Sequence, residues 1–243
     1  MDYTKNTTLS EIVREDFRAS RVFETHGLDF CCNGKRKLGD ACEEKGLDAD
    51  NILTELKKEL SGDIQQEENF DKMDPDVLIK YILDKHHAYI KRIMPLLSAF
   101  SEKVVRAHSN NHPELIRVSE LYHQVEAELT SHMFKEENVL FPFIIRMVEA
   151  KRNKTPLGAI PFGTVRNPIQ QMEAEHDSAG NAFHEMRTIT KDFGIPEDAC
   201  NTFKSYYEEL NNFENDLHKH IHLENNILHP KSIELEEVLL SNK

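Results

Sequence analysis

Apolar residues recur at intervals of three and four along most of the chain, which is the pattern of amphipathic helices rather than strands. After residue 74 this pattern continues through four long segments, separated by short polar or Pro/Gly-rich stretches. The segments are 75–107, 113–150, 165–192 and 197–239. Four helices joined by short connections predict an up-down-up-down four-helix bundle, so the expected fold class is all-α.

The N-terminal part of the chain has shorter helical patterns and more glycine. Thr8 and Glu11 form a T-x-x-E capping box at the start of a predicted helix over 8–25, and Gly27 follows as a stop signal. Two further short helical patterns lie near 40–45 and 50–60. These helices predict a small unit with a core of its own.

A polar, acidic stretch without apolar periodicity separates the two parts of the chain. Such a composition is typical of a linker. The expected organisation is a small helical, cysteine-containing domain over 1–60, a linker over 61–73 and a bundle over 74–243.

Composition narrows the class of protein. A net charge of −13 disfavours nucleic acid and anionic membrane surfaces as partners, because both call for basic patches. No apolar run approaches the roughly 18 residues of a membrane span, and the N-terminus lacks the apolar core of a secretory signal. The 4 cysteines are a poor disulfide framework in a chain of 243 residues, so they are expected to be reduced thiols. We therefore expect a cytoplasmic protein whose partners are cations or other proteins.

An internal repeat supplies the candidate chemistry. The stretch HMFKEENVLFP, which begins at His132, returns 88 residues later as HIHLENNILHP. Residues i and i+4 of a helix lie on one face, about 6 Å apart along the axis. His132 with Glu136, and His220 with Glu224, therefore each present an imidazole beside a carboxylate. The copies fall on the second and fourth predicted helices, where a pseudo-twofold relation would bring both pairs into the core.

Histidines on the other two predicted helices extend the repeat to whole helical hairpins. His87 precedes His132 by 45 residues, and His176 precedes His220 by 44 residues. The spacing does not decide between His87 and its neighbour His86, because the apolar stripe of this helix points slightly closer to His86.

His108, at the end of the first long helix, is added as a fifth candidate histidine ligand. Five histidines and two glutamates exceed the four ligands of a usual zinc site and favour a pair of iron or manganese ions that share the carboxylates. If both glutamates and one oxo or hydroxo group bridge, one ion is six-coordinate and the other five-coordinate. The open position implies chemistry with oxygen or nitric oxide, or release of metal. The alternative for one His-x-x-x-Glu pair is a solvated or ion-paired surface feature, which the duplication argues against.

These motifs, together with GLDFCCNGKRKLGDAC at 27–42 and EAEHDSAG at 173–180, resemble the Repair of Iron Centres family, the iron-sulfur cluster repair di-iron proteins. The resemblance covers nearly the whole chain and implies a hemerythrin-like bundle preceded by a double-cysteine domain. It also implies two iron ions with carboxylate bridges, and it favours His87 over His86. The implied metal ligands are His87, His108, His132, Glu136, His176, His220 and Glu224.

The same resemblance implies the repair of iron-sulfur clusters damaged by oxidative or nitrosative stress, with damaged iron-sulfur proteins or cluster-assembly proteins as partners. Iron donation and reaction at an open iron position are both left open, and so is whether the chain is an enzyme. The alternatives are a nitric oxide reductase and a hemerythrin-type protein that binds or senses oxygen or nitric oxide. Oxygen-carrying hemerythrins pair two histidines at i and i+4 on the third helix, where this chain has His176 and Gly180. His108 is expected to supply the missing ligand.

The adjacent Cys31 and Cys32 are candidate redox thiols or transient ligands. A bond between them would close a strained ring, and no C-x-x-C spacing supports a zinc site. Three nearby basic residues favour the thiolate: Lys35, Arg36 and Lys37. The alternative is that both are small core residues beside a tight turn. Cys42 and Cys200 are expected to be structural. Because a small domain often gains stability by self-association, a homodimer is also expected.

Overall fold

The computed structural model describes residues 3–31, 33–61 and 70–241. Across these ranges the regular structure is helical, apart from an isolated antiparallel β-bridge between Thr8 and Lys37. The predicted all-α class is therefore confirmed. Within the same ranges, no helix combines the length and the apolar character that crossing a bilayer requires.

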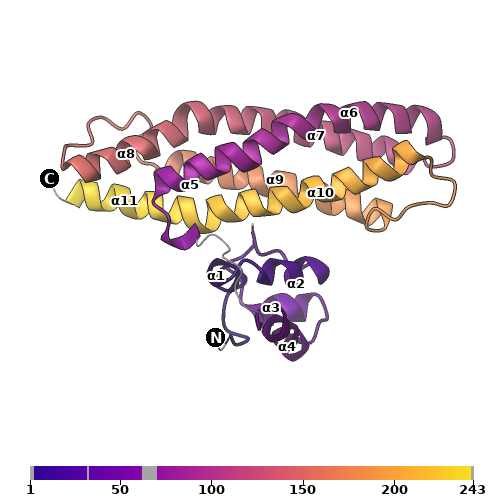
Figure 1. The fold of residues 1–243 in the computed structure, drawn as a ribbon, viewed down its shortest axis with the longest axis horizontal. Coiled ribbons are helices and arrows are strands. Elements are labelled where there is room, and N and C mark those ends of the chain that lie inside the picture. The colour runs from indigo at the N-terminus through magenta and orange to yellow at the C-terminus, as the bar shows by residue number, and fades with distance from the viewer. Residues whose placement is uncertain (1–2, 32, 62–69, 242–243) are drawn as a thin grey trace. The chain divides into compact units, whose positions relative to one another are not determined.

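Four long helical rods make up the bundle and lie side by side (Figure 1). Three of them contain a five-residue π-helical segment, here labelled η. In the first hairpin, one rod consists of α5 (Pro75–Ile82), η2 (Leu83–His87) and α6 (Ala88–His108). The other rod consists of α7 (Glu114–Lys135), η3 (Glu136–Leu140) and α8 (Phe141–Asn153). In the second hairpin, one rod is α9 (Arg166–Thr190). The other rod consists of α10 (Asn201–Leu223), η4 (Glu224–Leu228) and α11 (His229–Ser241).

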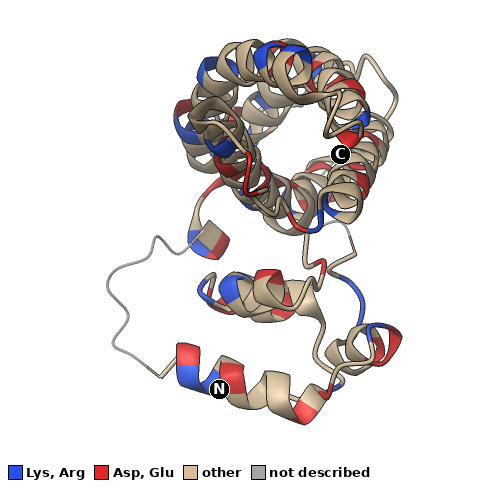
Figure 2. Ribbon diagram, turned by 90° about the vertical axis from the view of Figure 1, so that its right-hand side faces the viewer, with Lys and Arg blue, Asp and Glu red and all other residues tan. Residues whose placement is uncertain are grey.

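The rods pack through the apolar stripes that the sequence predicts. The stripe of the first rod is buried at Ile79, Ile82, Ile90 and Leu97, and each fully buried aliphatic side chain of this kind contributes about 1.5–3 kcal/mol to folding. Large side chains from the other rods fill the same core: Tyr122, Phe183, Tyr206 and Phe213. Figure 2 looks along the rods and shows them surrounding a common axis.

Ion pairs between neighbouring rods lie outside this core. Arg117 on α7 pairs with Glu185 on α9 at 2.7 Å, and Arg152 on α8 pairs with Asp76 on α5 at 2.6 Å. Exposed pairs of this kind contribute at most about 1 kcal/mol each. The rods are therefore held mainly by the buried apolar stripes and by the buried polar groups among them.

The N-terminal helices are α1 (Leu9–Glu15), α2 (Ala19–Thr25), α3 (Leu38–Glu44) and α4 (Ala49–Glu59). The capping box is confirmed, because the Thr8 hydroxyl accepts from the N–H of Glu11 at 3.2 Å and the Glu11 carboxylate accepts from the N–H of Thr8 at 2.9 Å. The helices enclose an apolar core of Leu9, Ile12, Phe23, Leu38 and Leu56.

The prediction of one continuous helix over 8–25 is wrong, because the chain breaks at Asp16. This residue adopts an extended conformation (φ −151°, ψ 108°), and its carboxylate accepts from the N–H of Arg18 at 3.0 Å. The Arg18 guanidinium also pairs with the same carboxylate at 2.6 Å. A short acidic side chain that bonds nearby backbone in this way competes with the helical hydrogen-bond ladder and favours a new helix start.

The described chain divides into two compact units: Met1–Asp74 with Ile221–Lys231, and Pro75–His220 with Ser232–Lys243. Most of the predicted linker, residues 62–69, lies outside the described residues, and Phe70–Lys72 forms a single 3-10 turn. The domain limits at 60 and 74 stay predictions. Helices α10 and η4 pass from His220 to Ile221 without a break, so the helical spacing between His220 and Glu224 is fixed within one rod.

Candidate metal centre

The three π-helical segments coincide with candidate ligands. His87 is the last residue of η2, Glu136 is the first of η3, and Glu224 is the first of η4. Such segments insert one residue into an α-helix and are frequent at functional sites.

Both copies of the repeat contain a proline that interrupts the α-helical hydrogen bonding. Pro142 and Pro230 have no N–H for the carbonyl four residues earlier, so the α-helical ladder cannot be completed at residues 138 and 226. The π-helical segments η3 and η4 include these two positions. The Leu-x-Pro that ends each copy is thus a local cause of the altered helical register.

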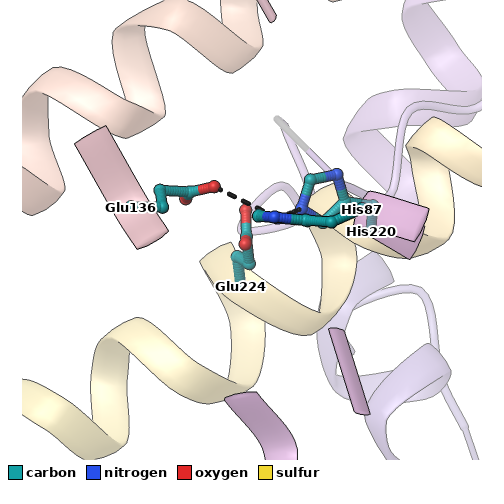
Figure 3. Close-up of side chains that lie close together, drawn as sticks. All are labelled: His87, Glu136, His220 and Glu224. Carbon is teal, nitrogen blue, oxygen red and sulfur yellow. Dashed lines mark hydrogen bonds and ion pairs between the residues drawn. The ribbon is translucent and has the colours of Figure 1, made fainter. Parts of the chain in front are cut away.

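Six side chains converge in two groups that share both glutamates. Within each group, one nitrogen or oxygen from every residue lies within 4.8 Å of the others. Figure 3 shows the first group, which draws one histidine from each hairpin. The groups are His87, Glu136, His220, Glu224 and His132, Glu136, His176, Glu224.

Glu136 shows most directly how a carboxylate is shared. Its Oε1 lies 3.3 Å from Nε2 of His132, and its Oε2 lies 3.4 Å from Nε2 of His87. The histidines also face each other in pairs, with Nε2 atoms 3.2 Å apart for His87 and His220 and 3.1 Å apart for His132 and His176. The two oxygens of the Glu136 carboxylate therefore lie against histidines of different groups.

The six residues fit a pair of metal ions. All are buried, with at most 1% of any of them exposed. Uncompensated burial of a carboxylate costs several kcal/mol, and two facing imidazole nitrogens satisfy each other only through a proton or a shared ligand. A cation in each group meets both needs. Imidazole nitrogen and carboxylate oxygen, without sulfur, are the ligands of paired iron or manganese in helical bundles.

Six of the seven predicted ligands are brought together, and His108 is not. His108 ends α6, 21 residues after His87, which is about 30 Å along a helix at 1.5 Å per residue. Its Nε2 lies 3.2 Å from Sγ of Cys200, and its ring packs on Phe203. The prediction of His108 as a ligand is therefore corrected. The histidine count falls from five to four, so both groups have the same composition.

His86, the alternative to His87, lies beside the site rather than in it. Its Nδ1 is 3.0 Å from Oδ1 of Asp216, and its ring is stacked on His220 at 5.8 Å between centroids. His86 and His87 are both buried, but of these two residues His87 is the one that belongs to a ligand group. The choice that the family resemblance favoured agrees with the geometry.

Two carboxylates that the sequence reasoning missed support one histidine of each group. Nδ1 of His87 is 2.7 Å from Glu137, and Nδ1 of His132 is 2.9 Å from Glu175. Burial by itself would raise the pKa of Glu137, but hydrogen bonds from Lys91 and His87 outweigh it and hold the pKa below its ordinary value.

Glu175 has the same arrangement on the other group. Burial is opposed by bonds from Lys135, His132 and Gln171, so its pKa is also lowered. An ionised carboxylate on Nδ1 fixes the tautomer that directs the Nε2 lone pair towards a metal. The available signal was adjacency, since Glu137 follows Glu136 and Glu175 precedes His176.

Glu137→Gln is expected to weaken metal binding about 10- to 100-fold, the usual effect of removing a carboxylate that orients a ligand histidine. Glutamine keeps an acceptor but removes the charge that holds His87 and Lys91 in place. Competition with a chromogenic chelator would measure the affinity. The exposed Glu149 provides the control, because Glu149→Gln makes the same chemical change away from the site. Equal affinities for the two variants would contradict the assigned role.

The described cysteines lie in three different settings. Cys31 is buried, and its thiol donates a hydrogen bond to Asp29. Cys200 is exposed, and its Sγ is hydrogen-bonded to Nε2 of His108. Cys42 is buried in the N-terminal core, where burial, followed by the charge of Asp48, raises the pKa of its thiol. Cys32 lies outside the described residues.

Comparison with known proteins assigns both parts of the chain to families. Residues 78–232 match the hemerythrin HHE cation binding domain. Residues 5–60 match a domain of unknown function, DUF542. The first match contains all six residues of the two groups.

Full-length relatives are similar across both parts. The chain is 35% identical over 235 residues to the iron-sulfur cluster repair protein YtfE of Yersinia pseudotuberculosis serotype O:1b (strain IP 31758). It has the same identity over the same length to the protein of that name from Yersinia pestis (strain Pestoides F). Each alignment covers 96% of this chain and 99% of the relative.

Proposed function

Since the chain belongs to the hemerythrin HHE family and to the family of YtfE-type iron-sulfur cluster repair proteins, we propose that it holds two iron ions and restores iron-sulfur clusters damaged by oxidative or nitrosative stress. Its clients are then damaged iron-sulfur proteins or the proteins that assemble clusters. The proposal places this work in the cytoplasm, a reducing compartment in which thiols stay available.

The observation that carries the proposal is the sharing of Glu136 and Glu224 between two groups of ligands. One ion needs only one group, so two groups with common carboxylates support a pair of ions held close together. Histidine and carboxylate donors favour iron over zinc in such a pair, because structural zinc sites usually include thiolates.

The residues of the chain have distinct tasks in this proposal. The four histidines and two glutamates bind the ions, while Glu137 and Glu175 orient His87 and His132. Four protein ligands for each ion leave coordination positions for other ligands. Phe141 is buried, and its ring packs against that of His87 with centroids 5.7 Å apart, which limits the access of water. When bound, the iron pair supplies one-electron chemistry and, on release, iron for a damaged cluster.

The test compares variants in the reactivation of a cluster-damaged enzyme of the aconitase type under anaerobic conditions. The parent is expected to restore activity. Glu136→Ala, which lacks one of the two shared carboxylates, is expected to restore at most about a tenth as much, since loss of a group that holds the metal costs 10- to 100-fold. Cys31→Ser/Cys32→Ser, which lacks the thiols, is expected to restore less than the parent. His108→Ala is the matched control, because it removes a histidine outside both groups and should repair like the parent.

Metal analysis and Mössbauer spectra of the anaerobically purified protein identify the metal in the same samples. A coupled pair of iron ions supports the proposal, whereas one isolated ion or zinc contradicts it. Catalytic turnover of nitric oxide to nitrous oxide without any cluster repair would instead assign the chain to the nitric oxide reductases. A reversible oxygen adduct without repair would assign it to the oxygen binders.

A further inference from the structure

The thiol of Cys31 has a defined partner. Its Sγ lies 3.3 Å from Oδ1 of Asp29, and the thiol is the donor because an ionised carboxylate only accepts. Cys31 is 4% exposed, whereas Asp29 is exposed. The thiol therefore donates to an anion that remains in contact with water.

The backbone of the cysteine loop holds the Asp29 carboxylate in place. Oδ1 also accepts from the N–H of Cys31 at 3.1 Å, while Oδ2 accepts from the N–H of Asn33 at 3.2 Å and from its side-chain amide at 2.7 Å. Gly34 permits this tight fold, since a Cβ there would lie 2.1 Å from the carbonyl oxygen of Phe30. The contact between carboxylate and thiol is thus part of the folded loop.

Two arginines of this part of the chain are paired with carboxylates other than Asp29. The guanidinium of Arg36, expected to favour the thiolate, pairs with Glu44 on α3. In the same compact unit, Arg14 on α1 pairs with Asp71 at 2.6 Å. His222 packs against Phe30, and its Nδ1 lies 3.1 Å from the side-chain amide of Asn226. Lys35 and Lys37 are exposed side chains of the same loop.

We propose that Asp29 is a positioning residue that holds Cys31 in its protonated, weakly nucleophilic form and so restrains the reactivity of this thiol. A negative charge beside a thiol opposes loss of its proton, and the thiolate is the nucleophile and the metal ligand. Neutralising the carboxylate or drawing it away, as an approaching cation would, releases Cys31 for reaction. This inference rests on the proposed role of Cys31 as a redox thiol.

Alkylation by iodoacetamide measures the restraint directly on the full-length, metal-bound protein. The sulfur forms a bond to carbon, iodide leaves, and the thiol proton passes to the buffer. Fragment-ion mass spectrometry follows Cys31 separately from the other cysteines, across a range of pH. Asp29→Asn is expected to alkylate about tenfold faster at neutral pH, with the midpoint of its pH profile about one unit lower, since one unit corresponds to a tenfold change in thiolate.

Two variants separate charge from structure. Asp29→Glu keeps a carboxylate and should leave the midpoint near that of the parent, even if the loop is loosened. Asp40→Asn removes an equal charge from an exposed position on α3 and should change nothing. A faster rate at every pH with an unchanged midpoint would mean that Asp29 only shields the thiol, and it would overturn the proposal. A raised midpoint in Asp29→Asn would overturn it too.

Failure of the role of Asp29 can be distinguished from failure of the proposed function. Alkylation reports on the thiol alone, while metal content and cluster reactivation report on the bundle and on repair. If Asp29→Asn leaves the midpoint unchanged and the parent still repairs clusters, only the role of Asp29 fails. If Cys31→Ser/Cys32→Ser repairs like the parent, the proposed role of the thiols fails even where the alkylation profile moves as expected.

Discussion

Glu136→Ala is expected to lose both metal ions, not one. The two oxygens of Glu136 each approach a histidine of a different group, at 3.3 and 3.4 Å. Alanine therefore removes one of four protein ligands from both groups at once and leaves Glu224 as the remaining shared carboxylate. Metal analysis of protein purified without oxygen should give two ions per chain for the parent and close to none for the variant.

Two further variants make this result specific. His176→Ala removes a ligand from one group only, so it should retain more metal than Glu136→Ala. His108→Ala should retain as much as the parent, because His108 lies at the far end of α6 beside Cys200. Retention of one full equivalent by Glu136→Ala would show that the carboxylate serves a single ion. Circular dichroism confirms that each variant is folded before its metal is counted.

Removing the metal from the parent is expected to lower its melting temperature by roughly 10–20 °C. The apo-protein buries two carboxylates and four imidazoles without the cations that compensate them, so binding should contribute on the order of 5 kcal/mol to the stability of the fold. At about 2–4 °C per kcal/mol for a chain of this size, that contribution gives the stated shift.

Differential scanning calorimetry before and after dialysis against a chelator measures the effect. The metal-free Glu136→Ala protein is the control, since a chelator should not change its melting temperature. If chelation shifts both proteins equally, the effect comes from the chelator rather than from the site. A parent that melts at the same temperature with and without metal would contradict a centre that ties the rods together.

Periodicity and repeats predicted the elements that depend on local pattern. The bounds of the four rods agree with the predicted segments to within a few residues. The duplicated His-x-x-x-Glu pairs and their upstream histidines lie close together in the structure. These features depend on the spacing of residues along a helix, which can be read directly from the sequence. The helix over 8–25 failed because Asp16 bonds the backbone ahead of it, a local competition that an apolar stripe does not reveal.

The ambiguity between His86 and His87 has a physical cause in η2. A wheel drawn at 3.6 residues per turn assumes an unbroken α-helix, but the π-helical segment over Leu83–His87 adds a residue to the turn. The true register is therefore displaced by about one position, and the stripe extrapolated from the residues on either side points at the wrong neighbour. His108 lies outside the site for a simpler reason, because the rise along α6 carries it about 30 Å from His87, farther than a metal site extends.

The exchange of ligands between the two hairpins bears on how such a centre arose. His87 is grouped with His220 and His132 with His176, so neither hairpin alone supplies both histidines of a group. Exchanging the hairpins converts one group into the other, with Glu136 and Glu224 changing places. A single ancestral hairpin of this kind would have built the centre only by pairing with a second copy of itself. Gene duplication and fusion then explain why one chain carries the symmetry of a dimer, and why the two copies still match at their ligands and at the Leu-x-Pro that follows them.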